Sequence, residues 1–414
     1  MVIRFRTTRL FHNFAVSYYC SCKKRRCTFT FKSGTIPEKD ASGRFSAMIS
    51  PHTFTFSLAG DGKAHLGGQG MPDSMIVDIH CHTGGIGAGG SGCFVSPALC
   101  GSWRFPLYLR SFGVTETELR IEGDGLVIRR LSESLAGSRR VSRAVILAMD
   151  GVIGDNGEPD AGRTELYIPN EFVSHEVRRY HNLLYGASIN PLRRDAIERL
   201  DRAAAEGAVL IKWLPSIQEI DPADKRFIPF YRRLAELDLP LLTHTGEESS
   251  FTRTRDELGD PERLRLPLAE GVTVIAAHAS SNGRNAGEKN HDRFIRLAAS
   301  FPNLYADISA LTQVNRLGHL ERLLRHGELH ERLLYGTDMP LIKTGITSPW
   351  FYACRLSPAK VRRIAAIANP WDQDVELKLA MGMTEGMFAN SARFLEKRLK
   401  ILGSSDGIHH LGGV

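Results

Sequence analysis

The sequence lacks a long hydrophobic run. No part of its 414 residues forms an uninterrupted apolar stretch of the roughly 18 to 20 residues that cross a bilayer. We therefore expect neither an integral membrane protein nor a membrane partner. Hydrophobic residues make up 42% of the chain and charged residues 24%, which is ordinary for a soluble globular protein with a large core.

A regular cysteine framework is also missing. The seven cysteines are an odd number at irregular spacing, and this usage is typical of a reducing compartment, so the sequence predicts a cytoplasmic location. Cys20, Cys22 and Cys27 lie close together, but no fourth ligand follows at the spacing of a zinc finger. A metal knuckle at these cysteines is therefore not favoured.

Acidic residues are absent before Glu38, and the charge is unevenly distributed as a result. Residues 1–72 carry 11 Lys or Arg against 3 Asp or Glu, whereas residues 73–414 have a net charge of −1. The basic character of the chain thus belongs to its head. A nucleic-acid partner for the main body loses its compositional support, and none is expected.

The basic head, residues 1–72, resembles an organellar transit peptide or a degenerate signal sequence. It lacks a continuous apolar segment of the usual length and a small-residue cleavage site. We favour a disordered extension or a start codon assigned too far upstream, with Met48, Met71 or Met75 as the true start.

From Met75 onward, short β-rich runs alternate with stretches of helical periodicity. Several of the runs are almost continuously apolar, which indicates strands buried on both faces by helices. Eight βα units of this kind predict an α/β protein, a closed (β/α)8 TIM barrel over residues 73–400, with a flexible tail at 401–414. The predicted strands are 75–82, 142–149, 183–189, 209–214, 239–244, 272–278, 304–307 and 333–336; the predicted helices are 115–136, 170–181, 195–206, 224–237, 291–300, 313–326, 358–368 and 375–399.

Polar residues end several of these strands. His80 and His82 close the first one, and because side chains alternate along a strand, both imidazoles point the same way and can reach one ion. His244, His278 and Asp338 end three later strands. The carboxyl ends of all barrel strands meet at one face, where the active sites of this fold lie, so we expect these residues to converge.

This pattern resembles the amidohydrolase superfamily, and within it the amidohydrolase-related branch of metal-dependent hydrolases and decarboxylases. The resemblance spans about residues 75–395. Its carriers are Asp78-Ile-His-Cys-His82, Ile211-Lys-Trp-Leu-Pro215, Thr243-His-Thr-Gly246, the strand that ends at His278, Tyr335-Gly-Thr-Asp-Met-Pro340 and Asn390-Ser-Ala-Arg-Phe394.

The resemblance implies a division of roles among these residues. His80, His82, His244 and Asp338 would be metal ligands, and His278 the catalytic histidine, with Asp338 also handling a proton. Imidazole nitrogens with a carboxylate suit Zn²⁺, and we expect one ion rather than two.

Lys212, which ends the fourth strand, admits three readings, one of which is an ordinary lysine that faces solvent at the end of a strand. In binuclear members of the superfamily a lysine there is carboxylated and bridges two metals, whereas in the resembled branch it is often unmodified. We favour an unmodified lysine that contacts substrate, together with Arg284, because an anionic or carbonyl-bearing substrate needs a cation near the metal.

The glycine-rich segment 83–92 contains a spacing found in dinucleotide-binding loops. No helical pattern follows it, so we interpret it as a loop that shapes the pocket.

The leading hypothesis is hydrolysis of an ester, lactone or amide of a small-molecule substrate by a metal-activated water. The alternative is non-oxidative decarboxylation of an aromatic or unsaturated carboxylic acid. A third hypothesis is that the basic head tethers a catalytically silent barrel to nucleic acid or to an anionic membrane. Barrels of this kind often pair, which makes a homodimer the first assembly to consider.

Overall fold

The computed structural model describes residues 15–23, 26–34, 52–57 and 75–409, with side chains from residue 75 to residue 400. The chain divides into two units, Met1–Met71 and Pro72–Val414. In the first unit, three strands form an antiparallel sheet in the order β1-β2-β3. The predicted extension at 1–72 stays a prediction, and its side chains lie outside the described residues. The strands are β1 (Ala15–Lys23), β2 (Arg26–Gly34) and β3 (His52–Ser57).

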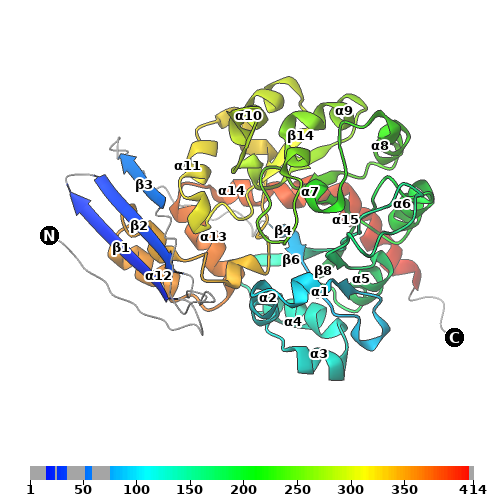
Figure 1. Cartoon of the computed structure of the whole chain (residues 1–414), viewed down its shortest axis with the longest axis horizontal. Helices are drawn as coiled ribbons and strands as arrows, with labels where there is room; N and C mark the ends of the chain where they lie inside the picture. Colours follow the sequence, from blue (N-terminus) through cyan, green and yellow to red (C-terminus); the bar gives the residue numbers. More distant parts are fainter. Residues whose placement is uncertain (1–14, 24–25, 35–51, 58–74, 410–414) are drawn as a thin grey trace, which may run out of the picture. The chain divides into compact units, whose positions relative to one another are not determined.

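The second unit is a TIM barrel of eight parallel strands, which confirms the predicted fold (Figure 1). Every predicted strand is present. The strands form one sheet in chain order, and helices form a ring outside it. The strands are β4 (Ile76–His82), β6 (Val141–Leu147), β8 (Leu183–Ala187), β9 (Leu210–Trp213), β10 (Leu241–Thr243), β11 (Val274–Ala276), β14 (Leu304–Asp307) and β15 (Leu333–Leu334).

Burial on both faces explains why the strands are apolar throughout. In β6, Val145 and Leu147 pack inside the barrel, while Ala144 and Ile146 pack against the surrounding helices. All four side chains are buried. Because neighbouring residues of a strand point to opposite faces, both sets must be apolar, and the usual alternation with polar residues disappears.

The helices depart from the prediction at three glycines, and one of them, Gly382 with φ of 113°, lies in a break at residues 381–384 that divides the helix predicted at 375–399. Gly123, with φ of 84°, divides the predicted helix 115–136 into two, and Gly318, with φ of 86°, shortens the one predicted at 313–326. The C-terminal helix α15 runs to His409, beyond the predicted end at residue 399. The longer helices are α2 (Arg104–Phe112), α3 (Glu116–Glu122), α4 (Gly125–Ala136), α5 (Asn170–Val177), α6 (Ala196–Ala205), α8 (Ile228–Glu236), α10 (Asn290–Ser300), α12 (Pro358–Ala365), α13 (Pro370–Ala380) and α15 (Asn390–His409); α11 is short (His319–Leu323).

A seam between β4 and the segment after β15 closes the barrel. The Ile79 amide donates to the Tyr335 carbonyl over 3.1 Å, and the Asp338 amide donates to the His80 carbonyl over 2.9 Å. Gly336 lies so close to β4 that a Cβ at this position would come within 2.9 Å of the His80 Cβ. Only glycine allows this approach, which brings the last strand against the first.

Asp78 fastens the seam from inside the core. Its fully buried carboxylate accepts hydrogen bonds from the His80 amide, the Thr337 amide and hydroxyl, and the Trp371 indole. Burial raises the pKa of Asp78 to about 6, although these donors act against the rise. The carboxylate therefore joins the first strand, the segment after β15 and α13.

None of the described helices is long and apolar enough to cross a membrane.

Candidate metal and substrate site

The polar strand ends meet at one end of the barrel, as the sequence predicts. The Nε2 atoms of His80 and His82 lie 3.0 Å apart. The Asp338 Oδ1 atom is 3.5 Å from the His80 Nε2 and 3.4 Å from the His82 Nε2. His80 and His82 from the first strand and Asp338 from the segment after the last strand thus place three possible metal-donor atoms close together, and all three residues line the bottom of a cavity.

These three donor atoms fit a divalent ion. Ligands about 2.0–2.1 Å from a tetrahedral ion lie roughly 3.3–3.4 Å from one another, and the separations of 3.0, 3.4 and 3.5 Å bracket that value. Two imidazoles and one carboxylate are also a donor set that borderline ions such as Zn²⁺ prefer. The geometry and the chemistry of the cluster therefore agree with a metal centre.

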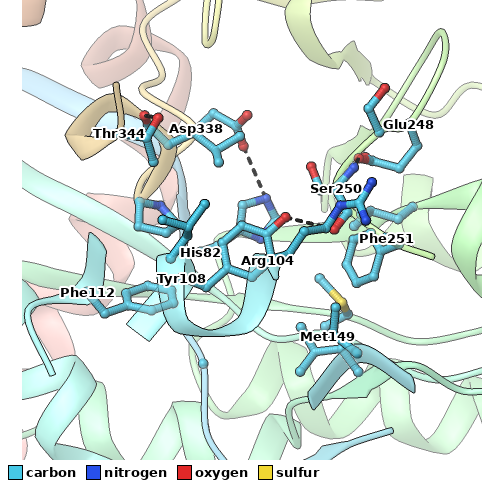
Figure 2. Close-up of a pocket in the computed structure, with 18 of the residues that line it drawn as sticks. His82, Arg104, Tyr108, Phe112, Met149, Glu248, Ser250, Phe251, Asp338 and Thr344 are labelled. Atoms are coloured by element: carbon cyan, nitrogen blue, oxygen red, sulfur yellow. Dashed lines mark hydrogen bonds and ion pairs between the residues drawn. The ribbon is translucent and has the colours of Figure 1, made fainter. Parts of the chain in front are cut away.

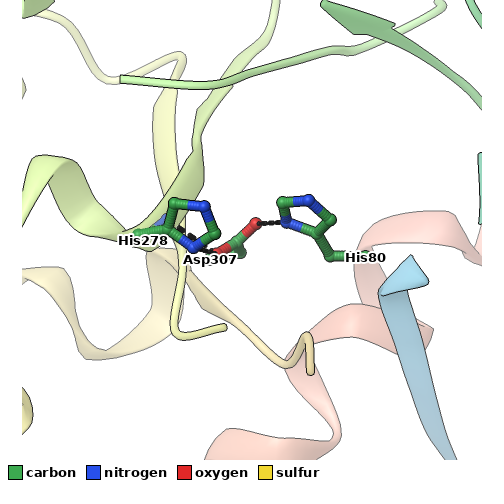
Figure 3. A group of neighbouring side chains, drawn as sticks. All are labelled: His80, His278 and Asp307. Atoms are coloured by element: carbon green, nitrogen blue, oxygen red, sulfur yellow. Dashed lines mark hydrogen bonds and ion pairs between the residues drawn. The ribbon is translucent and has the colours of Figure 1, made fainter. Parts of the chain in front are cut away.

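Asp307, at the end of β14, contacts the Nδ1 side of the His80 ring, opposite the Nε2 atom that faces His82 (Figure 3). Its Oδ2 lies 2.7 Å from the His80 Nδ1, and both side chains are buried. Burial acts to raise the pKa of Asp307, but His80 outweighs it and holds that pKa well below its usual range. An ionised carboxylate at this place keeps the proton on Nδ1 and leaves the Nε2 lone pair free, the arrangement that metal-binding histidines use.

Asp307 also holds His278, with the help of Ser309. The Asp307 Oδ1 accepts from the His278 amide over 2.8 Å, and the Ser309 Oγ lies 2.8 Å from the His278 Nδ1. The Ser309 carbonyl lies 3.2 Å from the same nitrogen and can only accept, so His278 carries its proton on Nδ1. Burial and the charge of Arg316 hold the pKa of His278 well below its usual range. Its Nε2 is therefore an unprotonated acceptor.

The backbone is strained where these side chains are presented. His278 has φ of 56° and Asp338 has φ of 61°, both in the left-handed region that non-glycine residues seldom adopt. Such conformations cost on the order of 1–3 kcal/mol each and cluster at functional sites. The left-handed backbone at His278 and Asp338 directs their side chains differently from those of a regular β-strand.

Asp338 is ionised in this setting. Burial acts to raise the pKa of Asp338, but His278, the hydrogen bond from His82 and the charge of His80 hold it well below its usual range. The same residue thus presents a charged carboxylate to the histidines around it.

His244 lies next to the cluster but outside its group of close donor atoms. Its ring meets that of His278 with centroids 5.2 Å apart, and its Nδ1 is 3.4 Å from the Glu248 carboxylate. Burial lowers the pKa of His244. The structure therefore brings His80, His82 and Asp338 together directly and places His244 one side chain away.

Lys212 reaches the centre of the cluster. Its Nζ is 2.9 Å from the His80 Nε2, and the side chain is buried. Burial lowers the pKa of Lys212 to about 8. The lysine that the sequence left ambiguous therefore faces the site rather than solvent.

These residues line one side of a cavity of about 290 Å³ (Figure 2). Helix α2 covers one side, and the Tyr108 hydroxyl donates to the Ser250 carbonyl over 2.7 Å, which ties α2 to the loop after β10. The first residues of the glycine-rich segment, from Thr83 to Ile86, line the cavity, so that segment shapes the pocket as expected. Most of the wall is apolar, with aromatic side chains at Tyr108, Phe112 and Phe251.

Arg284 is not part of this cavity. It is exposed at β12 (Arg284–Asn285), a hairpin strand outside the barrel sheet, and its guanidinium donates to the Gly287 carbonyl.

The sequence analysis did not identify four residues of the site: Asp307, Ser309, Gln313 and Arg316. Asp307 ends a predicted strand, as the expected ligands do. A rule applied to every strand end would have found Asp307.

The chain was compared with curated proteins and with solved structures. No curated protein matches the chain. Among solved structures, an uncharacterised TIM-barrel protein from Bordetella bronchiseptica is 16% identical, with 75% of this chain and 100% of that chain covered at a TM-score of 0.47. The 5-carboxyvanillate decarboxylase from Sphingomonas paucimobilis is 10% identical, with 78% and 99% covered at 0.42, and dihydroorotase from Campylobacter jejuni is 13% identical, with 80% and 83% covered at 0.39. Likenesses at this level do not assign a reaction.

A family model provides the assignment that these structures do not. The model described as amidohydrolase matches residues 141–366, which is more than half of the chain. The matched range includes Lys212, His244, His278 and Asp338, whereas β4, which carries the histidine pair, precedes it in the chain. The chain belongs to the amidohydrolase family, a family of metal-dependent enzymes.

Proposed function

We propose that the chain is a metal-dependent hydrolase that cleaves an ester, lactone or amide bond of a small carbonyl-bearing substrate. One observation carries the proposal: His80, His82 and Asp338 present donor atoms 3.0 to 3.5 Å apart at the bottom of a cavity. The unprotonated Nε2 of His278 belongs to the same cavity. Family membership supports an enzyme, and this geometry supports the class of chemistry.

The proposed ligands are His80, His82, His244 and Asp338, around a single Zn²⁺ ion. Three of them already form a close group, and His244 would join by turning from Glu248 toward the cluster. Asp307 would fix the orientation of His80, since it holds the Nδ1 proton of that ring. Lys212 would stay unmodified and contact the substrate.

When bound, the ion would act as a Lewis acid and lower the pKa of a water molecule from about 16 toward 7. The side chains supply the rest. His278 accepts or returns a proton at its Nε2, because Nδ1 is occupied by Ser309. Asp338, held ionised by the surrounding histidines, can accept a proton from the attacking water. The apolar wall excludes bulk water, which strengthens these electrostatic interactions.

Metal content tests the ligand assignment. Elemental analysis of the purified wild type should give one divalent ion per chain, and Asp338→Ala and His82→Ala should each lose it. His175→Ala, at an exposed histidine of α5, is the matched control and should retain the ion. Retention of stoichiometric metal by Asp338→Ala would remove the central ligand from the proposal.

Product analysis separates hydrolysis from decarboxylation, the second candidate. The buried Lys212 ammonium, 2.9 Å from His80, favours that candidate because it could hold a substrate carboxylate beside the ion. The metal-loaded protein should be assayed with panels of lactones, esters, amides and aryl acids in ¹⁸O-labelled water. Hydrolysis places one labelled oxygen in the product, whereas release of carbon dioxide from an acid without label in the remaining product would reject the hydrolase proposal.

A further inference from the structure

Arg316 is a buried arginine in the wall of the cavity. It ends the short 3-10 helix η6 (Val314–Arg316), its side chain lines the cavity, and only 6% of the residue is exposed. Its Nη1 donates to the Ser281 hydroxyl and to the Asn282 side-chain oxygen. Its Nε has no hydrogen-bond partner among the residues that the structure describes. One edge of the guanidinium, formed by Nε and Nη2, is therefore unused within the described chain.

Another arginine shows how this fold satisfies a buried guanidinium. Arg193 is 8% exposed, and its Nε and Nη2 donate to the two oxygens of Asp150 over 2.7 and 2.6 Å. For Arg316, no carboxylate within the described part of the chain comes within 4.0 Å of the guanidinium. The edge that Arg193 uses for a carboxylate is the edge that Arg316 leaves open. That edge matches the two oxygens of a carboxylate in a planar, paired arrangement.

Gln313 provides a second open donor from the same segment. It lies three residues before Arg316, lines the same cavity and is 3% exposed. Its side-chain Nε2 is buried without a hydrogen-bond partner among the described residues. Buried donors are almost always paired in folded proteins. Two unpaired ones on one segment of a cavity wall indicate a ligand with acceptor oxygens.

Arg316 lines the same cavity as His278 and the residues of the candidate metal centre. Burial lowers the pKa of Arg316, and the charges of Asp338, Glu248 and Asp307 act to raise it. The remainder of the cavity is largely apolar, with Leu107 and Phe112 from α2 and Phe251 from the loop after β10. The cavity thus combines the unpaired donors of Arg316 and Gln313 with a largely apolar chamber.

We infer that Arg316 and Gln313 bind a carboxylate of the substrate, whose remaining part is an apolar aryl or alkyl body that fills the chamber. This inference rests on the proposed function for the identity of the reacting bond, but not for the binding itself. The substrate class is a small amphipathic monocarboxylate. The oxygens of the substrate carboxylate accept hydrogen bonds from the Nε and Nη2 of Arg316 and from the side-chain Nε2 of Gln313. The reacting carbonyl of the substrate then lies toward His278 and Asp338.

Binding of three matched probes tests the inference. Phenylacetate, phenylacetamide and benzylphosphonate share one apolar body and differ in the polar group. Calorimetric titration of the metal-loaded protein should give phenylacetate an affinity about tenfold or more above that of phenylacetamide, because a hydrogen bond to a charged partner is worth about that factor. Arg316→Met should remove this preference, Arg316→Lys should restore part of it, and Gln313→Leu should reduce it severalfold.

Arg104→Met is the matched control, since Arg104 lines the same cavity from α2 and is partly exposed. It should keep the preference for phenylacetate. A preference that survives Arg316→Met, or that disappears in Arg104→Met instead, overturns the inference, as does equal binding of benzylphosphonate or the absence of any phenylacetate binding. An Arg316-dependent preference in a protein that turns over no ester, lactone or amide would retain the inference and reject the proposed function.

Discussion

Two buried polar groups of the core, Asp78 and Arg193, and two of the cavity wall, Arg316 and Gln313, differ in how many of their donors or acceptors form hydrogen bonds. Asp78 accepts four hydrogen bonds, and Arg193 meets both oxygens of Asp150. In the cavity wall, by contrast, Arg316 and Gln313 leave buried donors without partners among the described residues. We interpret the fully paired Asp78 and Arg193 as groups that hold the fold, and the unpaired donors of Arg316 and Gln313, which line the cavity, as groups that bind a ligand. Four substitutions test this comparison.

Arg193→Met should have the largest effect on stability. It leaves the buried Asp150 carboxylate without its partner, which costs about 3–5 kcal/mol of the free energy of unfolding. Urea denaturation of the metal-free protein measures the loss. The double variant Arg193→Met with Asp150→Leu should recover most of it, because no unpaired charge remains. A loss below about 1 kcal/mol for the single variant would contradict a structural role for the pair.

Asp78→Ala should cost somewhat less, about 2–4 kcal/mol, because the donors it leaves behind are neutral. Thr337 and Trp371 would keep buried N–H and O–H groups without an acceptor. Denaturation measured without metal separates this loss from any change in the site. Asp78→Asn, which keeps one acceptor oxygen, should fall between the wild type and Asp78→Ala; if both variants unfold like the wild type, the seam does not depend on Asp78.

Asp307→Asn should weaken metal binding about 10- to 100-fold, or roughly 1.4–2.7 kcal/mol, because the amide no longer fixes the proton on His80 Nδ1. Competition with a chelator of known affinity measures the change. Asp292→Asn, at an exposed position of α10, serves as the control and should bind metal like the wild type. Unchanged affinity in Asp307→Asn would show that the Asp307 contact does not tune the ligand.

Arg316→Met should have the smallest effect on stability, within about 1 kcal/mol of the wild type or slightly stabilising, because no described carboxylate loses a partner. The same denaturation assay allows direct comparison with Arg193→Met. A loss as large as that of Arg193→Met would show that Arg316 is a structural residue, and the contrast between the two arginines would fail.

Sequence reasoning identified the barrel and the polar ends of its strands because both follow from periodicity. The apolar runs locate the strands, and the rule that parallel strands end at one face places His80, His82, His244, His278 and Asp338 around the same end. The helix boundaries were less accurate, since Gly123, Gly318 and Gly382 interrupt patterns that indicate continuous helices.

The anion receptor could not be predicted in the same way. Arg284 and Arg316 both follow strand ends, and nothing in the sequence distinguishes them. The structure does, because Arg284 lies in an exposed hairpin and Arg316 in a buried 3-10 turn. Asp307 differs from Arg316, since its place at the end of a predicted strand could have been recognised, whereas its contact with His80 depends on the closed barrel.

The seam between β4 and the segment after β15 also sets when the site can form during synthesis. Asp78 and Thr337 are 259 residues apart, and at about 5–20 residues per second a ribosome needs roughly 13–50 s to produce the chain between them. Until then the nascent chain carries the histidine pair without its aspartate and the first strand without its last neighbour. A chain released before residue 338 would have most of the barrel sequence and no complete site.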